Sequence, residues 1–440
     1  MGAMTFNLDG FHEYQKPYPQ VFNFKKTMSV SRYNELDNKF DGCVDKDEVF
    51  ERLRDRMSGD YFNHVVKAQT SAISFSEYMF PAYKYLLPDV LMDDWLSIIC
   101  PHKKGKRDHS LHQPLTAYIV AELLGVNDSS RAFVIDKQTL LSRCAHLLID
   151  EKNTHTAYLR QYFLNLYQRE FPLKSERMKE MWAERLFSQA AIMAALFHDI
   201  GYPWQFLYLL GKGPSNVELI ANPVHAAQQV INEIENRLLV YPFYGYSLSS
   251  KHLPVVSYRK ELLLMIQDAI HKTHGFPGAL AFTYLNDVVR DYPADLDFEG
   301  ATCRFIQDWA AVAIMMHDMV RLYRSDDGEI LHPQYKLRFD TDPLSCLIAM
   351  ADILEEFGRP AASFKSYTHG TVTRYNYPCD STIVDVNQST LEIIYTYSKK
   401  SDAVQYRPIR EKEVNAYFNS DNCFIDMKAI GLNNAHCVVK

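Results

Sequence analysis

The sequence has few glycines, no paired cysteine motif and no long apolar run. Its 440 residues include 17 glycines, and its eight cysteines are scattered without a CxxC pair. This cysteine pattern excludes a zinc ribbon and does not indicate a secreted disulfide framework. No run of about 18 consecutive apolar residues predicts a membrane-spanning helix. We therefore expect a cytoplasmic protein without a membrane partner.

Phosphate-binding glycine motifs are missing as well. No GxxxxGK[ST] or GxGxxG segment occurs, so the sequence does not indicate the common nucleotide-binding loops. The net charge of -7 argues against an extended nucleic acid as a partner. A local basic cleft for a small phosphorylated ligand remains compatible with that charge.

Helical periodicity dominates the middle of the chain. Apolar residues recur at three- and four-residue spacing over most of residues 85–360, which favours helices over strands. The expected helices cover 110–125, 136–170, 176–199, 217–239, 258–273, 277–290, 302–323 and 343–357.

The pattern changes after Pro360. The segments STIVDV and STLEIIYTYS are rich in β-branched and aromatic residues with partial alternation, and a short helix is expected at 410–418. The expected fold is mainly α, a helical bundle with a smaller α/β C-terminal region. We divide the chain into an N-terminal helical and irregular region at 1–99, a central domain at 100–360 and the C-terminal region at 361–440.

A histidine and an aspartate end one of the expected helices. His198 and Asp199 follow the apolar run AAIMAALF, and Gly201 and Pro203 in the following GYP should stop the helix there. Adjacent residues on a regular helix point about 100° apart, so both reach one site only where the helix ends. The alternative is a pair that caps the helix end through backbone hydrogen bonds.

Two further segments carry ligand-type side chains. His109 and His112 in RDHSLH are three residues apart at a helix start. A metal-bound imidazole also needs an acceptor on its second nitrogen, which Asp108 or another carboxylate could supply. Asp352 lies in the apolar helix LIAMADILEEF, where a buried carboxylate requires a metal or another cation. A solvent-facing Asp352 is the alternative.

Histidines also occur in three intervening segments, which are NPVHAAQQ, AIHKTHG and AIMMHD. A single histidine on a helix is more often a structural residue than a ligand. A binuclear site nevertheless needs about five or six His and Asp ligands from several helices. The segments contribute His225, His271, His274 and His317 as candidates.

In this order, the motifs resemble the HD-domain superfamily of metal-dependent phosphohydrolases over roughly residues 100–360. The resemblance implies that the central domain is of this type. It also implies one metal held by the first His, the doublet and the last Asp, with the doublet Asp bridging to a second metal. The metal ligands carried over are His112, His198, Asp199, His274, His317 and Asp352.

Some assignments stay open within this resemblance. His109 is the alternative to His112, and a competing alignment uses His225 and His271. That alignment matches the phosphodiesterase branch with an HHE-type motif incompletely, because Lys272 follows His271. The GYP string directly follows the doublet here, so it does not identify a cyclic-dinucleotide substrate.

The resemblance implies hydrolysis of a phosphate ester or anhydride in a nucleotide or nucleotide-like substrate by a metal-activated hydroxide. The cofactor would be one or two divalent ions (Mn, Fe, Mg, Co, Ni or Zn), with Asp199, His274 and His317 in catalytic roles. The candidates for binding substrate phosphate are Lys272, Arg338 and Arg359.

Two other functions are compatible with the same motifs. One is a catalytically silent scaffold that binds a nucleotide or a protein partner for regulation. The other is a di-iron oxygenase, because the same ligands can hold redox iron. The sequence leaves homo-oligomer formation open.

Overall fold

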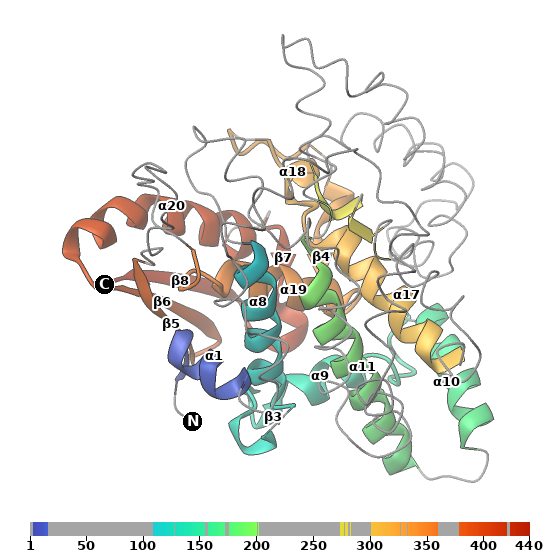
Figure 1. Ribbon diagram of the computed structural model, residues 1–440. Coiled ribbons are helices and arrows are strands. Elements are labelled where there is room, and N and C mark those ends of the chain that lie inside the picture. The colour runs from blue at the N-terminus through green and yellow to red at the C-terminus, as the bar shows by residue number, and fades with distance from the viewer. Residues whose placement is uncertain are drawn as a thin grey trace, which may run out of the picture.

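The structure is a computed structural model. It describes residues 3–15, 109–126, 128–154, 157–171, 176–199, 201, 273–276, 278, 279, 282, 301–325, 327–331, 333–359, 378–419 and 423–440. Helices gather around α11, and a sheet covered by another helix lies beside them (Figure 1).

The helical part is organised around α11, which packs against other helices on several sides. Alanines fill much of its second half and are buried, so neighbouring helices can approach closely. The described helices of this part are α8 (His109–Leu124), α9 (Leu140–His146), α10 (Ala157–Glu170), α11 (Glu176–Phe197), α17 (Ala301–Met316), α18 (Val320–Tyr323) and α19 (Pro343–Leu354).

Helix α19 is buried along its whole length. Asp342 caps its start by accepting a hydrogen bond from the Ser345 backbone N–H at 3.2 Å, and Pro343 occupies the first turn. The apolar residues around the helix pack against α8, α11 and α17. A carboxylate on this helix, such as that of Asp352, is therefore held inside the protein.

Four strands form the main sheet in the order β1-β5-β6-β8. Strands β5 and β6 make a hairpin whose two turn residues, Gln388 and Ser389, both have positive φ angles. Strand β1 pairs antiparallel with β5, and β8 pairs parallel with β6. The strands are β1 (Met4–Phe6), β5 (Cys379–Asn387), β6 (Thr390–Tyr397) and β8 (Asn434–Val439).

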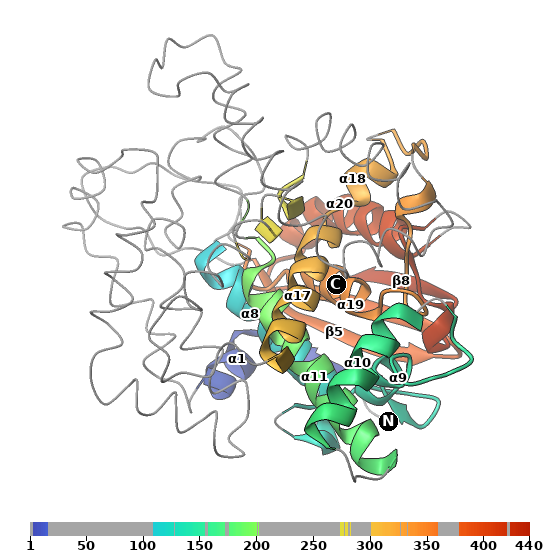
Figure 2. The same ribbon diagram turned by 90° about the vertical axis from the view of Figure 1, so that its right-hand side faces the viewer.

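Helix α20 (Lys400–Phe418) connects β6 to β8 and lies against these strands (Figures 1 and 2). Smaller elements complete the described chain. They are α1 (Leu8–Gln15), β2 (Val134–Ile135), β3 (Gln138–Thr139), β4 (Leu337–Arg338), β7 (Ile425–Asp426) and three short 3-10 helices at Ser129–Arg131, Pro333–Tyr335 and Lys428–Ile430.

The expectation of a mainly α fold is wrong, because the protein is a mixed α/β structure with a four-stranded sheet. The first strand of this sheet comes from the start of the chain, since Met4 pairs with Val384. Buried residues of the sheet and the helices also form one hydrophobic cluster. A three-residue strand separated from its partner by most of the chain leaves no periodic signal in the sequence.

Helix boundaries differ from the expected ones in several places. The helix expected at 136–170 begins only at Leu140, after β3, and is divided into α9 and α10, and the helix expected at 302–323 is divided into α17 and α18. The helix expected at 343–357 ends at Leu354, and the one expected at 410–418 begins already at Lys400. The expected helix at 217–239 lies outside the described residues, as do residues 258–272 of the helix expected at 258–273 and most of 277–290. The division into three regions stays a prediction. Among the helices described, none is long and apolar enough to cross a membrane.

Candidate metal centre

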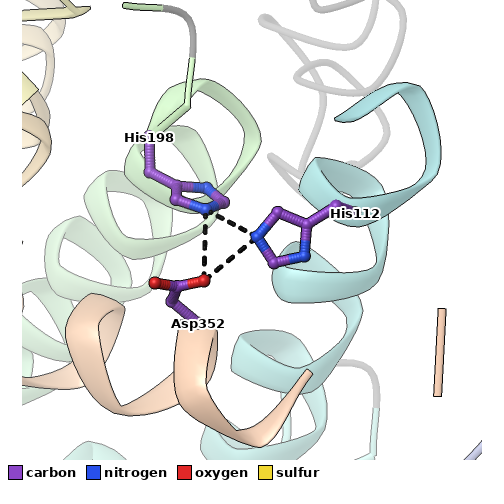
Figure 3. Close-up of side chains that lie close together, drawn as sticks. All are labelled: His112, His198 and Asp352. Carbon is purple, nitrogen blue, oxygen red and sulfur yellow. Dashed lines mark hydrogen bonds and ion pairs between the residues drawn. The ribbon is translucent and has the colours of Figure 1, made fainter. Parts of the chain in front are cut away.

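Three helix ends bring the centre together. His112 lies in the first turn of α8, His198 follows the last residue of α11, and Asp352 lies in the last turn of α19. Their side chains point toward one another (Figure 3). The Nε2 atom of His112 is 3.0 Å from Oδ1 of Asp352 and 3.1 Å from Nε2 of His198. This buried group could hold a metal ion.

A second group lies beside the first. The Nε2 atom of His274 is 2.9 Å from Oδ1 of Asp199 and 3.0 Å from Nε2 of His317. His198, Asp199 and His317 also have ligand atoms close enough to share one ion. The structure therefore contains two adjacent groups of buried side chains that could hold metal.

Asp199 lies between the two groups. Its Oδ2 atom is 3.4 Å from Nε2 of His112, and its Oδ1 atom is 3.4 Å from Nε2 of His198. Since Oδ1 also approaches His274, the carboxylate contacts imidazoles of both groups. Asp199 is therefore placed to act as a shared ligand.

In each of the four imidazoles of these groups, Nε2 faces the centre and Nδ1 faces a hydrogen-bond acceptor. The Nδ1 contacts are His112 to Glu355 Oε2 (2.5 Å), His198 to Ala195 O (2.8 Å), His274 to Asp318 Oδ2 (2.8 Å) and His317 to Ile314 O (2.7 Å). Metal-binding histidines are commonly held in this way by a carboxylate or a backbone carbonyl.

The backbone contacts determine two of the tautomers. A carbonyl oxygen can only accept a hydrogen bond, so His198 and His317 must donate from Nδ1. Their neutral rings then carry a lone pair on Nε2, the atom that faces the centre. Two ligands at right angles, each about 2.1 Å from an ion, are about 3.0 Å apart. The His274–His317 distance fits such a pair, so the donor set suits a divalent ion.

The doublets His198-Asp199 and His317-Asp318 occupy equivalent local positions. Each begins directly after a helix, α11 or α17, and each histidine bonds the carbonyl three residues earlier. The last carbonyls of a helix have no partner within it, so they are available for this contact. The end of each helix thus provides the carbonyl oxygen that accepts from the histidine Nδ1. It also ends the regular helical direction at the doublet, as the sequence pattern predicted for His198 and Asp199.

Burial and charge affect the histidines differently. Burial lowers the pKa of His198 to about 3 and also lowers the pKa of His317, so both rings are neutral at pH 7. Burial also acts to lower the pKa of His274, but the charges of Asp318 and Asp199 outweigh it and raise the pKa to about 9. Without a metal, His274 therefore carries a proton that a metal ion would displace.

Close backbone contact places His274 next to the first doublet. A Cβ atom on Gly201 would lie 1.9 Å from the carbonyl oxygen of His274 and 2.5 Å from the backbone nitrogen of Gly278. The absence of a side chain at Gly201 therefore lets the two segments touch. Asp318 also accepts a hydrogen bond from the His274 backbone N–H at 2.9 Å. Pro203, expected to help end the helix, lies outside the described residues.

The remaining predicted residues are placed as follows. His109 is the first residue of α8, but its side chain is not among the described parts of the structure. His225, His271 and Lys272 lie outside the described residues. Arg338 lies on β4 and makes two hydrogen bonds to Asp340, and no described contact joins it to the metal centre. The structure thus brings together the six preferred ligands without supporting a role for Arg338.

Arg359 lies beside the centre. Its Nη2 atom is 3.2 Å from the Asp352 carbonyl oxygen and 4.0 Å from Oδ1 of the same residue. Its Nε atom donates to the Glu355 carbonyl oxygen at 2.9 Å. The guanidinium group is therefore already engaged with the end of α19.

Sequence reasoning missed Glu355 and Asp318, which hold the Nδ1 atoms of His112 and His274. The sequence predicts an acceptor from Asp108 or another carboxylate, and Asp108 lies outside the described residues. Each missed carboxylate lies within three residues of a predicted ligand. This short separation in the sequence is the signal by which the two supporting carboxylates could have been found.

Comparisons with family models, with curated proteins and with solved structures found no match to this chain.

Proposed function

We propose that the protein is a metal-dependent phosphohydrolase that cleaves a phosphate ester or anhydride. The observation that carries the proposal is the orientation of the four histidines, whose Nδ1 atoms are held from outside while their Nε2 atoms converge on Asp199. Asp352 supplies a second carboxylate to the first group. Nitrogen and oxygen donors of this kind suit Mn, Fe, Co, Ni or Zn, and Mg where more oxygen ligands are available.

Divalent ions held by these residues would lower the pKa of water, so that a nucleophile is available at neutral pH, and would neutralise charge on phosphate oxygens. The residues of the chain supply the metal ligands and the nearby charge for this chemistry. Asp199 is shared between the groups, and the neutral rings of His198 and His317 present unprotonated Nε2 atoms. His274 contributes after losing its proton. Arg359 adds positive charge beside Asp352.

The proposed assignment to the HD-domain superfamily rests on the same six residues that the motifs singled out. Preference for a nucleotide or nucleotide-like substrate follows from that resemblance alone. The proposed compartment is the cytoplasm, because the sequence lacks a disulfide framework.

Metal analysis combined with an activity assay tests the proposal. The full chain is stripped with a chelator, reloaded with Mn and assayed on bis(p-nitrophenyl) phosphate and on a panel of nucleotides. We expect one or two bound ions per chain and hydrolysis that depends on them. Asp199→Ala should abolish both, whereas Asp9→Ala, at an exposed position on α1, should change neither. A wild-type chain that binds no transition metal and hydrolyses nothing would refute the proposal.

A further inference from the structure

Two adjacent glutamates follow the end of α19 and contact different parts of the protein. The helix ends at Leu354, and Glu355 has an extended backbone with φ -80° and ψ 93°. Consecutive side chains of an extended chain point to opposite sides. Glu355 and Glu356 are both buried, so each must find partners for its carboxylate inside the protein.

Glu355 is directed to the metal centre. Its Oε2 atom is 2.5 Å from Nδ1 of His112, and its Oε1 atom accepts a hydrogen bond from the Gly358 backbone N–H at 2.7 Å. Both carboxylate oxygens are therefore engaged, which fixes the orientation of the group. An ionised carboxylate on Nδ1 keeps the proton there and makes Nε2 a stronger donor to a metal.

Glu356 is directed to the sheet. Tyr397 on β6 donates its hydroxyl to Oε1 at 3.1 Å, and Nη1 of Arg410 on α20 is 3.1 Å from Oε2. The Nε atom of Arg359 is 3.2 Å from the same oxygen. Because a buried charge without its partner is costly, these contacts hold Glu356 firmly against β6 and α20.

Strand β6 and Arg359 also provide partners for the carbonyl groups at the end of α19. The hydroxyl of Tyr395 on β6 donates to the Ile353 carbonyl oxygen at 3.0 Å, and Arg359 donates to the carbonyls of Asp352 and Glu355. These are carbonyls at a helix end, where no partner exists within the helix. The turn that carries Asp352 is thus supported by the sheet and by Arg359.

We propose that Glu355 and Glu356 are positioning residues, Glu355 holding His112 as a metal ligand and Glu356 tying that contact to the C-terminal sheet. The inference rests on the metal-binding part of the proposed function and is independent of the reaction catalysed. It assigns β6 and α20 to the support of the metal centre. Metal affinity should therefore respond to side chains of β6 and α20 that contact no metal ligand.

The Glu355 contact is tested with Glu355→Gln and Glu355→Ala in the full chain. The dissociation constant for Zn is measured by competition with a chromophoric chelator, beside the unfolding temperature of the metal-free protein. We expect affinity to fall about 10- to 100-fold, as for other groups that orient metal-binding histidines. Glu180→Gln, at an exposed position on α11, is the matched control. Unchanged affinity in both Glu355 variants would overturn this role.

A second readout separates orientation of the ring from general stability. In ¹⁵N-histidine NMR spectra of the Zn-loaded protein, His112 should show a protonated Nδ1 in the wild type and weaker protection of that proton in Glu355→Gln. An unchanged His112 signal contradicts the proposal. A wild-type chain that binds no Zn overturns the proposed function instead, so the two failures are distinguishable.

The link to the sheet is tested through Arg410. Arg410→Met leaves Glu356 with one guanidinium partner, and we expect affinity for Zn to fall about 2- to 30-fold. Glu356→Gln combined with Arg410→Met should recover part of the loss, because the buried carboxylate is then neutral. Arg407→Met on the same helix is the control, since Arg407 bonds the Val439 carbonyl oxygen instead. A lower unfolding temperature with unchanged Zn affinity in Arg410→Met would overturn the link.

Discussion

Asp199 and Asp318 lie on opposite sides of one imidazole ring. Oδ1 of Asp199 is 2.9 Å from Nε2 of His274, and Oδ2 of Asp318 is 2.8 Å from its Nδ1. Both aspartates follow a histidine at a helix end. The same His-Asp dipeptide in the same local setting therefore places its carboxylate in two different roles. One carboxylate faces the candidate metal ligands, and the other supports a ligand from behind.

These positions predict different effects of the same substitution. Asp199→Asn should prevent binding of metal and abolish hydrolysis, because the shared charged ligand is lost. Asp318→Asn should weaken metal binding about 10- to 100-fold but retain hydrolysis when metal is saturating. Metal titrations of the hydrolysis rate measure both effects. Equal loss of activity in the two variants at saturating metal would contradict the assigned difference.

Gly201 should be intolerant of a side chain. A Cβ atom there would overlap the His274 backbone, which cannot move without displacing the ring. We expect Gly201→Ala to lower the free energy of unfolding by about 1–3 kcal/mol and to weaken metal binding. Denaturant unfolding and chelator competition provide the measurements.

Gly328 provides the control for that substitution. Its φ angle is +94°, but a Cβ atom would meet nothing within 4 Å. Gly328→Ala should therefore cost stability through backbone strain alone and leave metal affinity unchanged. Unchanged metal affinity in Gly201→Ala would show that the close contact does not position His274.

Local features of the sequence pointed to some of the six preferred ligands, and the order of the motifs, through the family resemblance, supplied the full set. His198 follows an apolar helix and precedes Gly201, and Asp352 lies in an apolar helix where a charge needs a partner. Ordered motifs then suggested that these segments meet. Their role as metal ligands stays a prediction, whereas their proximity is a feature of the structure.

The supporting residues and the sheet could not be predicted in the same way. Glu355 follows the end of an apolar helix, and only the tertiary structure shows that its carboxylate turns toward His112 rather than toward solvent. Strand β1 has three residues and pairs with a strand near the other end of the chain. Neither feature produces a periodic pattern, so the sequence predicted a mainly α fold with a smaller α/β C-terminal region, and this fold class is wrong.

The N-terminal strand should contribute to stability. Phe6 is buried and packs edge-on against Tyr118 of α8, with ring centroids 6.1 Å apart. Phe6→Ala should reduce the free energy of unfolding by about 3–5 kcal/mol. Denaturant unfolding measures the effect, and Met181→Ala, at an exposed position, should show almost none. A loss below about 1 kcal/mol for Phe6→Ala would contradict its place in the core.

His274 also predicts how metal binding depends on pH. Its metal-free pKa is about 9 because Asp318 and Asp199 outweigh the effect of burial. The raised pKa stabilises the metal-free fold fully below the ordinary value of 6.5, and this contribution is lost as pH rises through about 9. His198 and His317 have lowered pKa values, so both rings are already neutral at pH 7 and need not lose a proton when a metal binds.

Metal binding at pH 7.5 should therefore release about one proton per chain from His274. Calorimetry in buffers with different ionisation enthalpies measures that number directly. Release should vanish above about pH 9, where His274 is already neutral, and metal affinity should rise about tenfold per pH unit between pH 7 and 9. Asp318→Asn removes one of the two charges that raise this pKa, so it should release fewer protons than the wild type. Equal release by both proteins would show that the proton comes from another group.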